Sequence, residues 1–237
     1  MTADQGPEET GTEARPTRDA IVTAAFELFA ENGYEGTTVA DIVTRAGVGR
    51  RSFFRYFPTK EEVVFPDHEG ALERMVEFLR QGWQDPDPVH RACEAARLVM
   101  QMYAADPEFS VNRYALTRTV PALKAYEKSV VWRYERALAS YLEKRFAALP
   151  DGGARACAVA AGVVAAHNYG LRSWLRSGAL GDVAACVDQA LELVRRTWSQ
   201  AEEPIVVIAR SGTPAWRIVQ QVEAAQREHT KGTQDHT

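Results

Sequence analysis

The chain has 237 residues, of which 46% are hydrophobic and 25% charged, and its formal net charge at pH 7 is −4. This length and composition predict a globular protein with a sizeable core, and the negative charge argues against a protein that coats nucleic acid without sequence preference. Cys93, Cys157 and Cys186 form no CxxC pair, and the longest apolar run, 156–166, is too short to cross a bilayer. We therefore expect a cytoplasmic protein with no disulfide, zinc site or membrane segment.

The N-terminal part of the chain predicts a tail followed by two helices. Residues 1–16 are rich in Glu, Thr, Gly and Pro without apolar periodicity, which is typical of a disordered tail. A first helix is expected from Thr17 to a stop at Gly33, because its apolar residues repeat on one face. A second helix is expected from Thr38, where a capping-box pattern begins, to Gly47.

The stretch from Gly47 to Glu62, GVGRRSFFRYFPTKEE, predicts a third short helix that ends at Pro58. Phe53 and Phe57 share one side of that helix, so we expect them to pack against the first two helices. Five basic residues and no acidic residue lie between 45 and 60. Two short helices joined by a tight turn, with a basic second helix, have the outline of a helix-turn-helix whose second helix enters the major groove of DNA.

The side chains of the third helix that are not needed for packing are the candidate DNA contacts. Arginine pairs with guanine through two hydrogen bonds, and Ser, Tyr and Lys suit phosphate oxygens. A solvated helix face is the competing interpretation of the arginines, and partial burial that of Phe54. The candidate DNA-binding residues are Thr38, Arg50, Arg51, Ser52, Phe54, Arg55, Tyr56 and Lys60.

These residues resemble the tetracycline-repressor (TetR) family of one-component bacterial regulators. The resemblance covers about 17–65, where the NGYEGTTV segment, the AGV turn, the FFRYF helix and the PTKEE helix start follow in the family's order. It implies an all-helical homodimer that binds a palindromic operator, usually as a repressor, and releases it when a small ligand occupies the C-terminal domain. Gly49 and Phe54 stand where the family often has Ser or Thr and Tyr, so more of the DNA contact is expected from the arginines.

The rest of the chain predicts a larger helical domain. A fourth helix is expected from Thr59 toward Trp83, with interruptions at Pro66 and Gly70. Further helices are expected over 89–105, 108–118, 120–148, 154–177 and 182–200. The predicted fold is all-α, with a helix-turn-helix domain over 17–65 and a ligand-binding and dimerisation domain over 66–203.

A short extension is expected after the helical domain. The β-branched run PIVVIA over 204–209 predicts a strand, and Thr213-Pro214 predicts the start of a last amphipathic helix. We assign residues 204–237 to this extension. Its role is left open, with pairing to a symmetry mate as one interpretation.

The length and aromatic content of the C-terminal domain favour a small hydrophobic or amphipathic effector, since pockets in helical bundles are lined by apolar and aromatic side chains with a few polar groups. The RRSFFRYF helix and the terminal helices resemble a subgroup of the family, and this resemblance implies an acyl-CoA-like effector. Ordinary core packing is the competing interpretation for most of the candidates, and a hydrogen-bonded interior pair for His167 and Asn168. The candidate ligand-binding residues are Met100, Tyr103, Arg113, Trp132, His167, Asn168 and Trp174.

A homodimer is expected through two late helices. One carries small residues at every fourth position and the next carries an apolar stripe, so the two helices and their copies could form a four-helix interface. The competing interpretation is that both helices pack inside one subunit. The candidate interface residues are Ala158, Gly162, Ala166, Val187, Leu191, Val194 and Trp198.

No enzyme motif is present: the chain contains no GxSxG, HExxH, Walker loop or complete GxGxxG. We therefore expect a regulator without catalytic residues, metal or cofactor, whose partners are double-stranded operator DNA and a small effector. An alternative is a protein-interaction regulator with the same fold that senses no small ligand.

Overall fold

The computed structural model of the chain describes residues 14–199, together with positions 214, 216, 217, 219 and 220. Residues up to 199 form one compact unit, and the residues from 200 onward form a second. Regular secondary structure in the described residues is entirely helical. The predicted strand over 204–209 lies outside the described residues, and of the predicted last helix only 216–217 and 219–220 are described, as helical.

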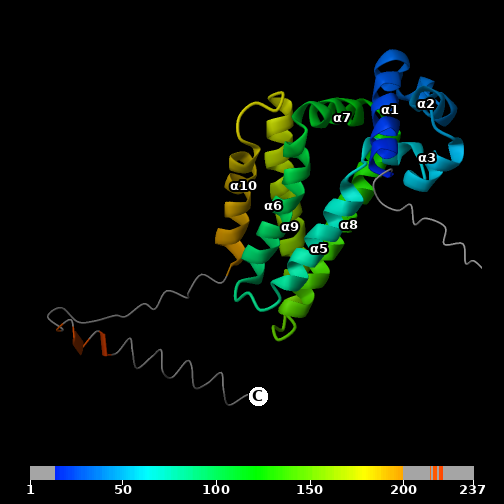
Figure 1. Cartoon of the computed structure of the whole chain (residues 1–237). Helices are drawn as coiled ribbons and strands as arrows, with labels where there is room; N and C mark the ends of the chain where they lie inside the picture. The colour runs from blue at the N-terminus through cyan, green and yellow to red at the C-terminus, as the bar shows by residue number, and fades with distance from the viewer. Residues whose placement is uncertain (1–13, 200–213, 215, 218, 221–237) are drawn as a thin grey trace, which may run out of the picture. The chain divides into compact units, whose positions relative to one another are not determined.

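Three helices form the N-terminal part of the first unit (Figure 1). They are α1 (Ala14–Gly36), α2 (Val39–Ala46) and α3 (Arg50–Tyr56). Helix α1 begins three residues before the predicted start, so residues 14–16 are helical and the prediction of a tail up to residue 16 was wrong there. Gly33 has φ 73°, a left-handed conformation that glycine adopts without strain, and it kinks α1 at the predicted stop.

The turn between α2 and α3 is fixed by local hydrogen bonds. The Thr38 hydroxyl accepts from the backbone N–H of Asp41, while the Asp41 carboxylate accepts from the N–H of Thr38, which completes the predicted capping box. Gly47 ends α2 with φ 66°. Gly49 begins α3 in an extended conformation and, having no side chain, supplies no capping oxygen.

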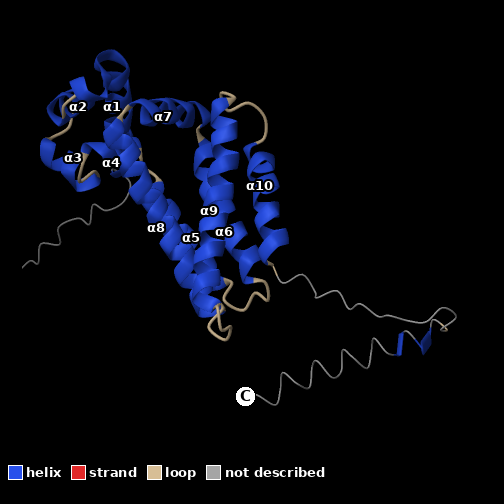
Figure 2. Ribbon diagram, turned by 180° about the vertical axis from the view of Figure 1, so that it is seen from behind, coloured by secondary structure: helices blue, strands red, loops and turns tan. Residues whose placement is uncertain are grey.

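Seven helices complete the unit (Figure 2). They are α4 (Lys60–Val64), α5 (His68–Gln81), α6 (Pro88–Ala105), α7 (Pro107–Thr119), α8 (Pro121–Arg145), α9 (Gly152–Arg176) and α10 (Val183–Trp198). Proline is the first residue of α6, α7 and α8, where its missing N–H leaves no helical hydrogen bond unmade.

The predicted fourth helix is two helices, α4 and α5. The break falls at Phe65–Asp67, because Pro66 has no N–H to continue the hydrogen-bond ladder. Gly70 lies inside α5, so the predicted interruption at Gly70 was wrong. A single glycine weakens a helix but does not stop one that tertiary contacts support.

The described residues form two hydrophobic clusters. One fills the space between α1 to α4, and it also contains Val120 and Leu123 from the start of α8. The other lies between α5, α6, α8, α9 and α10. Helix α7 crosses from the tops of α6 and α9 to α1, so it joins the two groups of helices (Figure 1).

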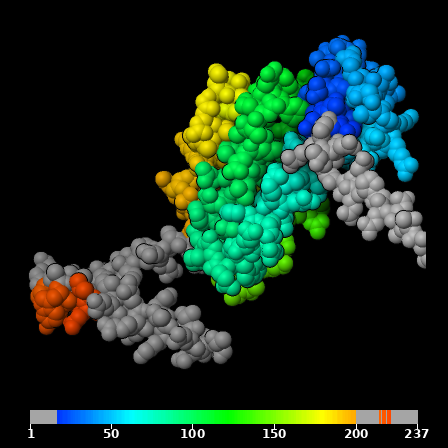
Figure 3. Space-filling model, viewed as in Figure 1, coloured from blue at the N-terminus to red at the C-terminus, as the bar shows by residue number. Residues whose placement is uncertain are grey.

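Helices α9 and α10 approach each other closely. A Cβ atom at Gly170 would lie 2.6 Å from the Cys186 carbonyl oxygen and 2.7 Å from the Val187 Cα, which real Cβ atoms do not tolerate. The α9–α10 hairpin lies on the side of the unit away from α1 to α3, as the yellow and orange surface shows (Figure 3). The glycine therefore permits a tight hairpin at that side.

Candidate DNA-binding helix and effector cavity

Helix α3 has the predicted division between a buried and an exposed side. Phe53 and Phe57 are buried in the core formed with α1 and α2, and their rings lie 5.9 Å apart. Arg50 and Arg51 are exposed, and Phe54 is 43% exposed on the same side of the helix. The aromatic residues at 53 and 57 thus hold the helix in place and leave its arginines at the surface.

Fewer basic side chains in this region lack an acidic partner than the sequence indicates. Arg45 pairs with Glu27 at 3.2 Å and with Glu31 at 2.7 Å, so its charge is offset within the protein. Within the described residues no carboxylate lies within ion-pair distance of the three arginines of α3, which are Arg50, Arg51 and Arg55. These three guanidinium groups therefore provide the unpaired positive charge of the helix-turn-helix.

Stacking holds two of these arginines near their neighbours. The Arg50 guanidinium lies 5.7 Å from the centre of the Phe54 ring. Arg55 lies 4.7 Å from the centre of the Tyr56 ring and donates a hydrogen bond of 2.9 Å to the Tyr56 hydroxyl. Ser52 and Tyr56 are half-buried at the edge of the same surface. All the α3 residues predicted to touch DNA therefore lie together.

Two other predicted DNA contacts have internal partners. The Thr38 hydroxyl donates to the Asp41 carboxylate at 2.7 Å. The Lys60 ammonium donates to the carbonyl oxygens of Tyr34 at 2.9 Å and Thr37 at 3.0 Å, and lies 4.0 Å from the centre of the Tyr34 ring. Lys60 therefore ties α4 to the end of α1, and the sequence pattern did not reveal this role.

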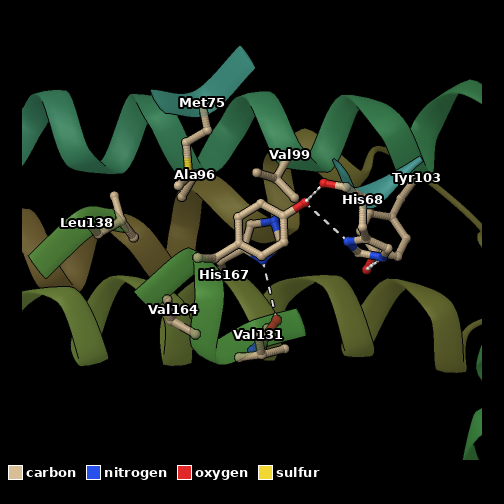
Figure 4. Close-up of a pocket in the computed structure, with 11 residues that line it drawn as sticks. His68, Met75, Ala96, Val99, Tyr103, Val131, Leu138, Val164 and His167 are labelled. Carbon is tan, nitrogen blue, oxygen red and sulfur yellow. Dashed lines mark hydrogen bonds between the residues drawn. The ribbon is translucent and has the colours of Figure 1, made fainter. Parts of the chain in front are cut away.

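A small cavity of about 40 Å³ lies between α5, α6, α8 and α9. This volume accommodates a few water molecules and is well below that of typical ligand pockets, so an effector must widen it. Met75, Ala96 and Leu138 lie at one end, with His68 and Tyr103 at the other (Figure 4). The lining residues are His68, Met75, Ala96, Val99, Tyr103, Val131, Tyr134, Leu138, Val164, His167 and Asn168.

Hydrogen bonds at the polar end of this cavity assign the protons of His68. The Tyr134 hydroxyl donates to the His68 carbonyl oxygen at 2.9 Å, so it accepts from the His68 Nδ1–H at 3.1 Å. The His68 Nε2 is then left to accept from the Tyr103 hydroxyl at 3.4 Å. Burial, with the nearby Arg113 charge, holds the pKa of His68 well below its usual value, so this imidazole is neutral at pH 7.

A second, polar cavity of about 30 Å³ adjoins the first and shares His68, Tyr103, Val131 and Asn168 with it. Arg113 lies in its wall and is 3% exposed. The Arg113 guanidinium lies 4.4 Å from the centre of the Tyr103 ring and 5.5 Å from that of Phe109. Its Nη2 atom is buried and has no hydrogen-bond partner. Among the described residues, Arg113 is therefore a buried cation in contact with aromatic faces and without an acidic partner.

His167 supplies a second buried polar atom without a partner. Its Nδ1 lies 3.5 Å from the Asn168 Oδ1, and its buried Nε2 has no hydrogen-bond partner. Burial lowers the pKa of His167 to about 4, so the ring is neutral at pH 7. With the Nδ1 proton directed at Asn168, the Nε2 is an acceptor in the wall of the apolar cavity.

The predicted ligand-binding residues divide into three groups. Tyr103, His167 and Asn168 line the apolar cavity, and Arg113 lines the polar one. Trp132 is 54% exposed and lines an outer groove that shares Glu127, Val131 and Arg172 with the polar cavity. Met100 and Trp174 line none of these cavities and are buried in the core.

Among the lining residues that sequence reasoning missed, His68 and Tyr134 supply polar atoms to the cavity. They lie 66 positions apart, and their hydrogen bonds arise only when α5 packs on α8. The one local signal was a histidine placed at a helix start after a proline, which carries no information about a distant tyrosine.

The predicted dimer residues lie in different environments. Ala158 is exposed, Gly162 and Ala166 are half-buried, and Trp198 is partly buried. The apolar stripe of α10 is buried inside the subunit, because it packs on α6 and α9, and consists of Val187, Leu191 and Val194. Those three side chains are already shielded from water within one subunit, so their burial does not require a second copy.

Two further properties of the described residues bear on function. No group of three or more His, Cys, Asp or Glu side chains in that part of the chain is placed to hold a metal ion. None of the described helices combines the length and apolar character that a membrane crossing requires.

Family models match both parts of the chain. The model for bacterial regulatory proteins of the tetR family matches residues 21–65. The model for the MftR C-terminal domain matches residues 87–199. The first match contains α2 and α3, and the second contains the helices that line the two cavities apart from α5.

Relatives and solved structures agree with these matches. The regulator TcmR of Streptomyces glaucescens is 35% identical over 40% of this chain and 42% of its own length. HbdR of an Aromatoleum strain is 27% identical over 57% and 58% of the two chains. The chain thus spans about half the length of these two relatives, both of which are named as transcriptional regulators.

The fold has a solved counterpart. The crystal structure of a putative TetR-family regulator from Syntrophomonas wolfei superposes with a TM-score of 0.58 at 19% identity, over 82% of this chain and 99% of that one. The solved structure adds a likeness of fold, and the two family models, which match residues 21–65 and 87–199, identify the chain as a member of the TetR family of bacterial regulatory proteins.

Proposed function

We propose that the protein is a ligand-responsive transcriptional repressor of the cytoplasm that binds a palindromic operator as a homodimer. The observation that carries this proposal is the exposed side of α3, where Arg50, Arg51 and Arg55 have no carboxylate partner among the described residues. Unpaired guanidinium groups on a recognition helix suit base edges and phosphates in the major groove. The buried Phe53 and Phe57 give that helix a fixed position.

The effector binds in the bundle, in the apolar cavity and its polar neighbour. The wall residues Tyr103, His167 and Asn168 offer polar atoms beside apolar side chains, as in many small-molecule sites. Because the cavity is only about 40 Å³, an effector has to move the surrounding helices, and this movement is what weakens DNA binding.

The second copy binds the exposed side of the α9–α10 hairpin. Tyr169 and Leu193 are each 70% exposed there, and Ala161 and Ala165 leave a low surface between helical turns. Large apolar side chains on a flat helical surface are typical of subunit interfaces. Of the interface residues predicted from the sequence, Ala158 is exposed and belongs to this interface. The apolar stripe of α10 is buried, so Leu193 contributes to the interface in its place.

A gel-shift experiment tests the proposed function. The ligand-free protein should retard DNA from upstream of its own gene in the presence of competitor DNA, and the affinity should fall as salt rises. Arg51→Ala should weaken the band, whereas Arg80→Ala, which removes the same charge from α5, should not. A wild-type protein that gives no competitor-resistant band with any nearby upstream DNA would refute the proposal.

The small volume of the cavity favours one alternative, a regulator that responds to another protein and to no small ligand. Thermal-shift measurements with acyl-CoAs, fatty acids, lactones and antibiotics separate the two functions. Stabilisation by any of them, together with release of the operator, supports the effector.

A further inference from the structure

We propose that the effector is an amphipathic monocarboxylate whose carboxylate pairs with Arg113 and whose apolar chain occupies the cavity between Met75 and Leu138. This inference rests on the proposed function, because it assigns a chemical class to the ligand of that site. It starts from a buried charge that the protein itself leaves unpaired.

Arg113 is unusual among the arginines of the described residues. It is 3% exposed, its Nη2 has no hydrogen-bond partner, and no carboxylate lies within ion-pair distance of it in the described residues. A buried charge without a counter-ion is costly, and two aromatic faces offset only part of that cost. An arginine retained in such a place is expected to have its partner supplied from outside.

The charges around the polar cavity favour a single negative charge. Its ionised side chains are Arg113, Arg172 and Glu127, and Glu127 faces Arg172 at 3.7 Å. His68, in the same wall, is neutral because it is buried and hydrogen-bonded to two tyrosines. Two cations and one carboxylate leave an excess of one positive charge, which a monoanion neutralises.

The shape of the site favours a carboxylate over a larger anion. The polar cavity is about 30 Å³, and a guanidinium presents two parallel N–H groups that match the two oxygens of a carboxylate. The hydroxyls of Ser110 and Thr117 already donate to backbone carbonyls, at 3.0 and 2.8 Å, and do not compete as donors for the ligand. The guanidinium geometry therefore favours a carboxylate as the head group of the ligand.

The two cavities together select an amphiphile. Beyond His68 and Tyr103 the lining becomes apolar, with Met75, Val99 and Leu138, and it contains no ionised side chain (Figure 4). A ligand with its carboxylate at Arg113 therefore extends its chain away from charge and toward the far end of the bundle. The alkyl chain of the ligand displaces water from an apolar surface, and this burial stabilises the complex.

Decanoate, decan-1-ol and decanoyl-CoA are suitable probes, because they share a chain and differ in the head group. With the full-length protein, isothermal titration should show decanoate binding at least about tenfold more tightly than decan-1-ol. Decanoate should also release the operator. Equal affinities for the acid and the alcohol would overturn the proposal, and so would tighter binding of decanoyl-CoA that does not depend on Arg113.

Arg113→Met is the decisive variant, with Arg118→Met, which removes an exposed arginine from the same helix, as its matched control. Arg113→Met should weaken decanoate binding by roughly 30-fold and leave decan-1-ol binding unchanged. Arg118→Met should keep the preference for the acid, because Arg118 is exposed and lines neither of the two cavities. Without ligand, the melting temperature of Arg113→Met should equal or exceed that of wild type, since an unpaired buried charge has been removed.

The outcomes separate this proposal from the proposed function. Release of the operator by a neutral ligand, from wild type and Arg113→Met alike, would refute the carboxylate and leave a ligand-responsive repressor. Failure of the ligand-free protein to bind any operator would refute the repressor itself. Persistence of the acid preference in Arg113→Met would refute the role of Arg113.

Discussion

Phe26 of α1 and Phe109 of α7 lie with their ring centres 4.5 Å apart, and this pair joins α1 to α7, the helix that carries Arg113. Phe109 also lies 5.5 Å from the Arg113 guanidinium. An anion that draws Arg113 away from Phe109 therefore disturbs a ring that rests on α1. The contact offers a physical route from the effector to the helix-turn-helix.

Phe109→Ala should uncouple the effector from DNA. We expect ligand-free operator affinity and effector affinity close to wild type, but an effect of the ligand on operator affinity that is at least about fivefold smaller. Fluorescence anisotropy with labelled operator, measured with and without ligand, gives this effect. Phe78→Ala is the control and should leave the coupling intact, because it removes a partly buried ring of α5 that stacks on Arg91 of α6.

Arg50→Ala and Arg51→Ala should each weaken operator binding by about 1–3 kcal/mol, because each removes an unpaired guanidinium from the exposed side of α3. Loss of a phosphate contact lowers the slope of log affinity against log salt by about one, whereas loss of a base contact also relaxes sequence preference. Gel shifts over a salt series distinguish the two roles. Unchanged binding in both variants would exclude α3 as the recognition helix.

Phe57→Ala and Phe54→Ala form a matched pair on one short helix. Phe57 is buried, so its truncation should lower the free energy of unfolding by about 3–5 kcal/mol. Phe54 is 43% exposed, and its truncation should cost less than about 1 kcal/mol while weakening DNA binding. Urea unfolding followed by circular dichroism measures both. Equal costs would contradict the division of α3 into a packed and a free side.

Gly170→Ala should destabilise the bundle by about 1–3 kcal/mol, because its Cβ would overlap backbone atoms of α10 and force α9 and α10 apart. Gly153→Ala is the control, since a Cβ there meets no atom within 4 Å and alanine favours a helix. Thermal melts compare the two variants. A Gly170→Ala protein as stable as wild type would show that the hairpin can adjust without cost.

Stability should fall as the pH drops from 6.5 to 4, in part because of His167. Its pKa is about 4 in the folded protein and 6.5 when unfolded, so in this range only the unfolded chain takes up the proton. The full effect is about 3 kcal/mol, present above pH 6.5 and lost as the pH approaches 4. His167→Gln should therefore lose less of its free energy of unfolding between pH 6.5 and 4, as measured by urea titrations. A loss as steep as that of wild type would contradict the buried neutral state.

The helices and the division of α3 into a buried and an exposed side follow closely from the sequence because their signals are local. A capping box at Thr38 and a glycine at 47 act within one or two turns, and the structure confirms them. The phase of α3 likewise follows from spacing alone, with Phe53 and Phe57 four residues apart.

The cavity and the helix partners could not be predicted, because they depend on contacts between distant segments. Met100 and Trp174 were equally good candidates for a pocket by composition, yet they face the core. The stripe of Val187, Leu191 and Val194 predicts an apolar face correctly but does not say whether α6, α9 or a second copy covers it. Likewise, the carbonyl oxygens that accept from Lys60 belong to Thr37 and Tyr34, which lie 23 and 26 positions away.

Leu123 and Val120 give the DNA-binding core a part that lies outside the segment matched by its family model. Both side chains come from the start of α8, more than fifty positions after α4 ends. A chimera that grafts residues up to 65 onto the effector domain of another regulator would inherit a foreign α8 under its helix-turn-helix. Exchange of operator specificity between such proteins must therefore carry these two positions along, or repack that surface.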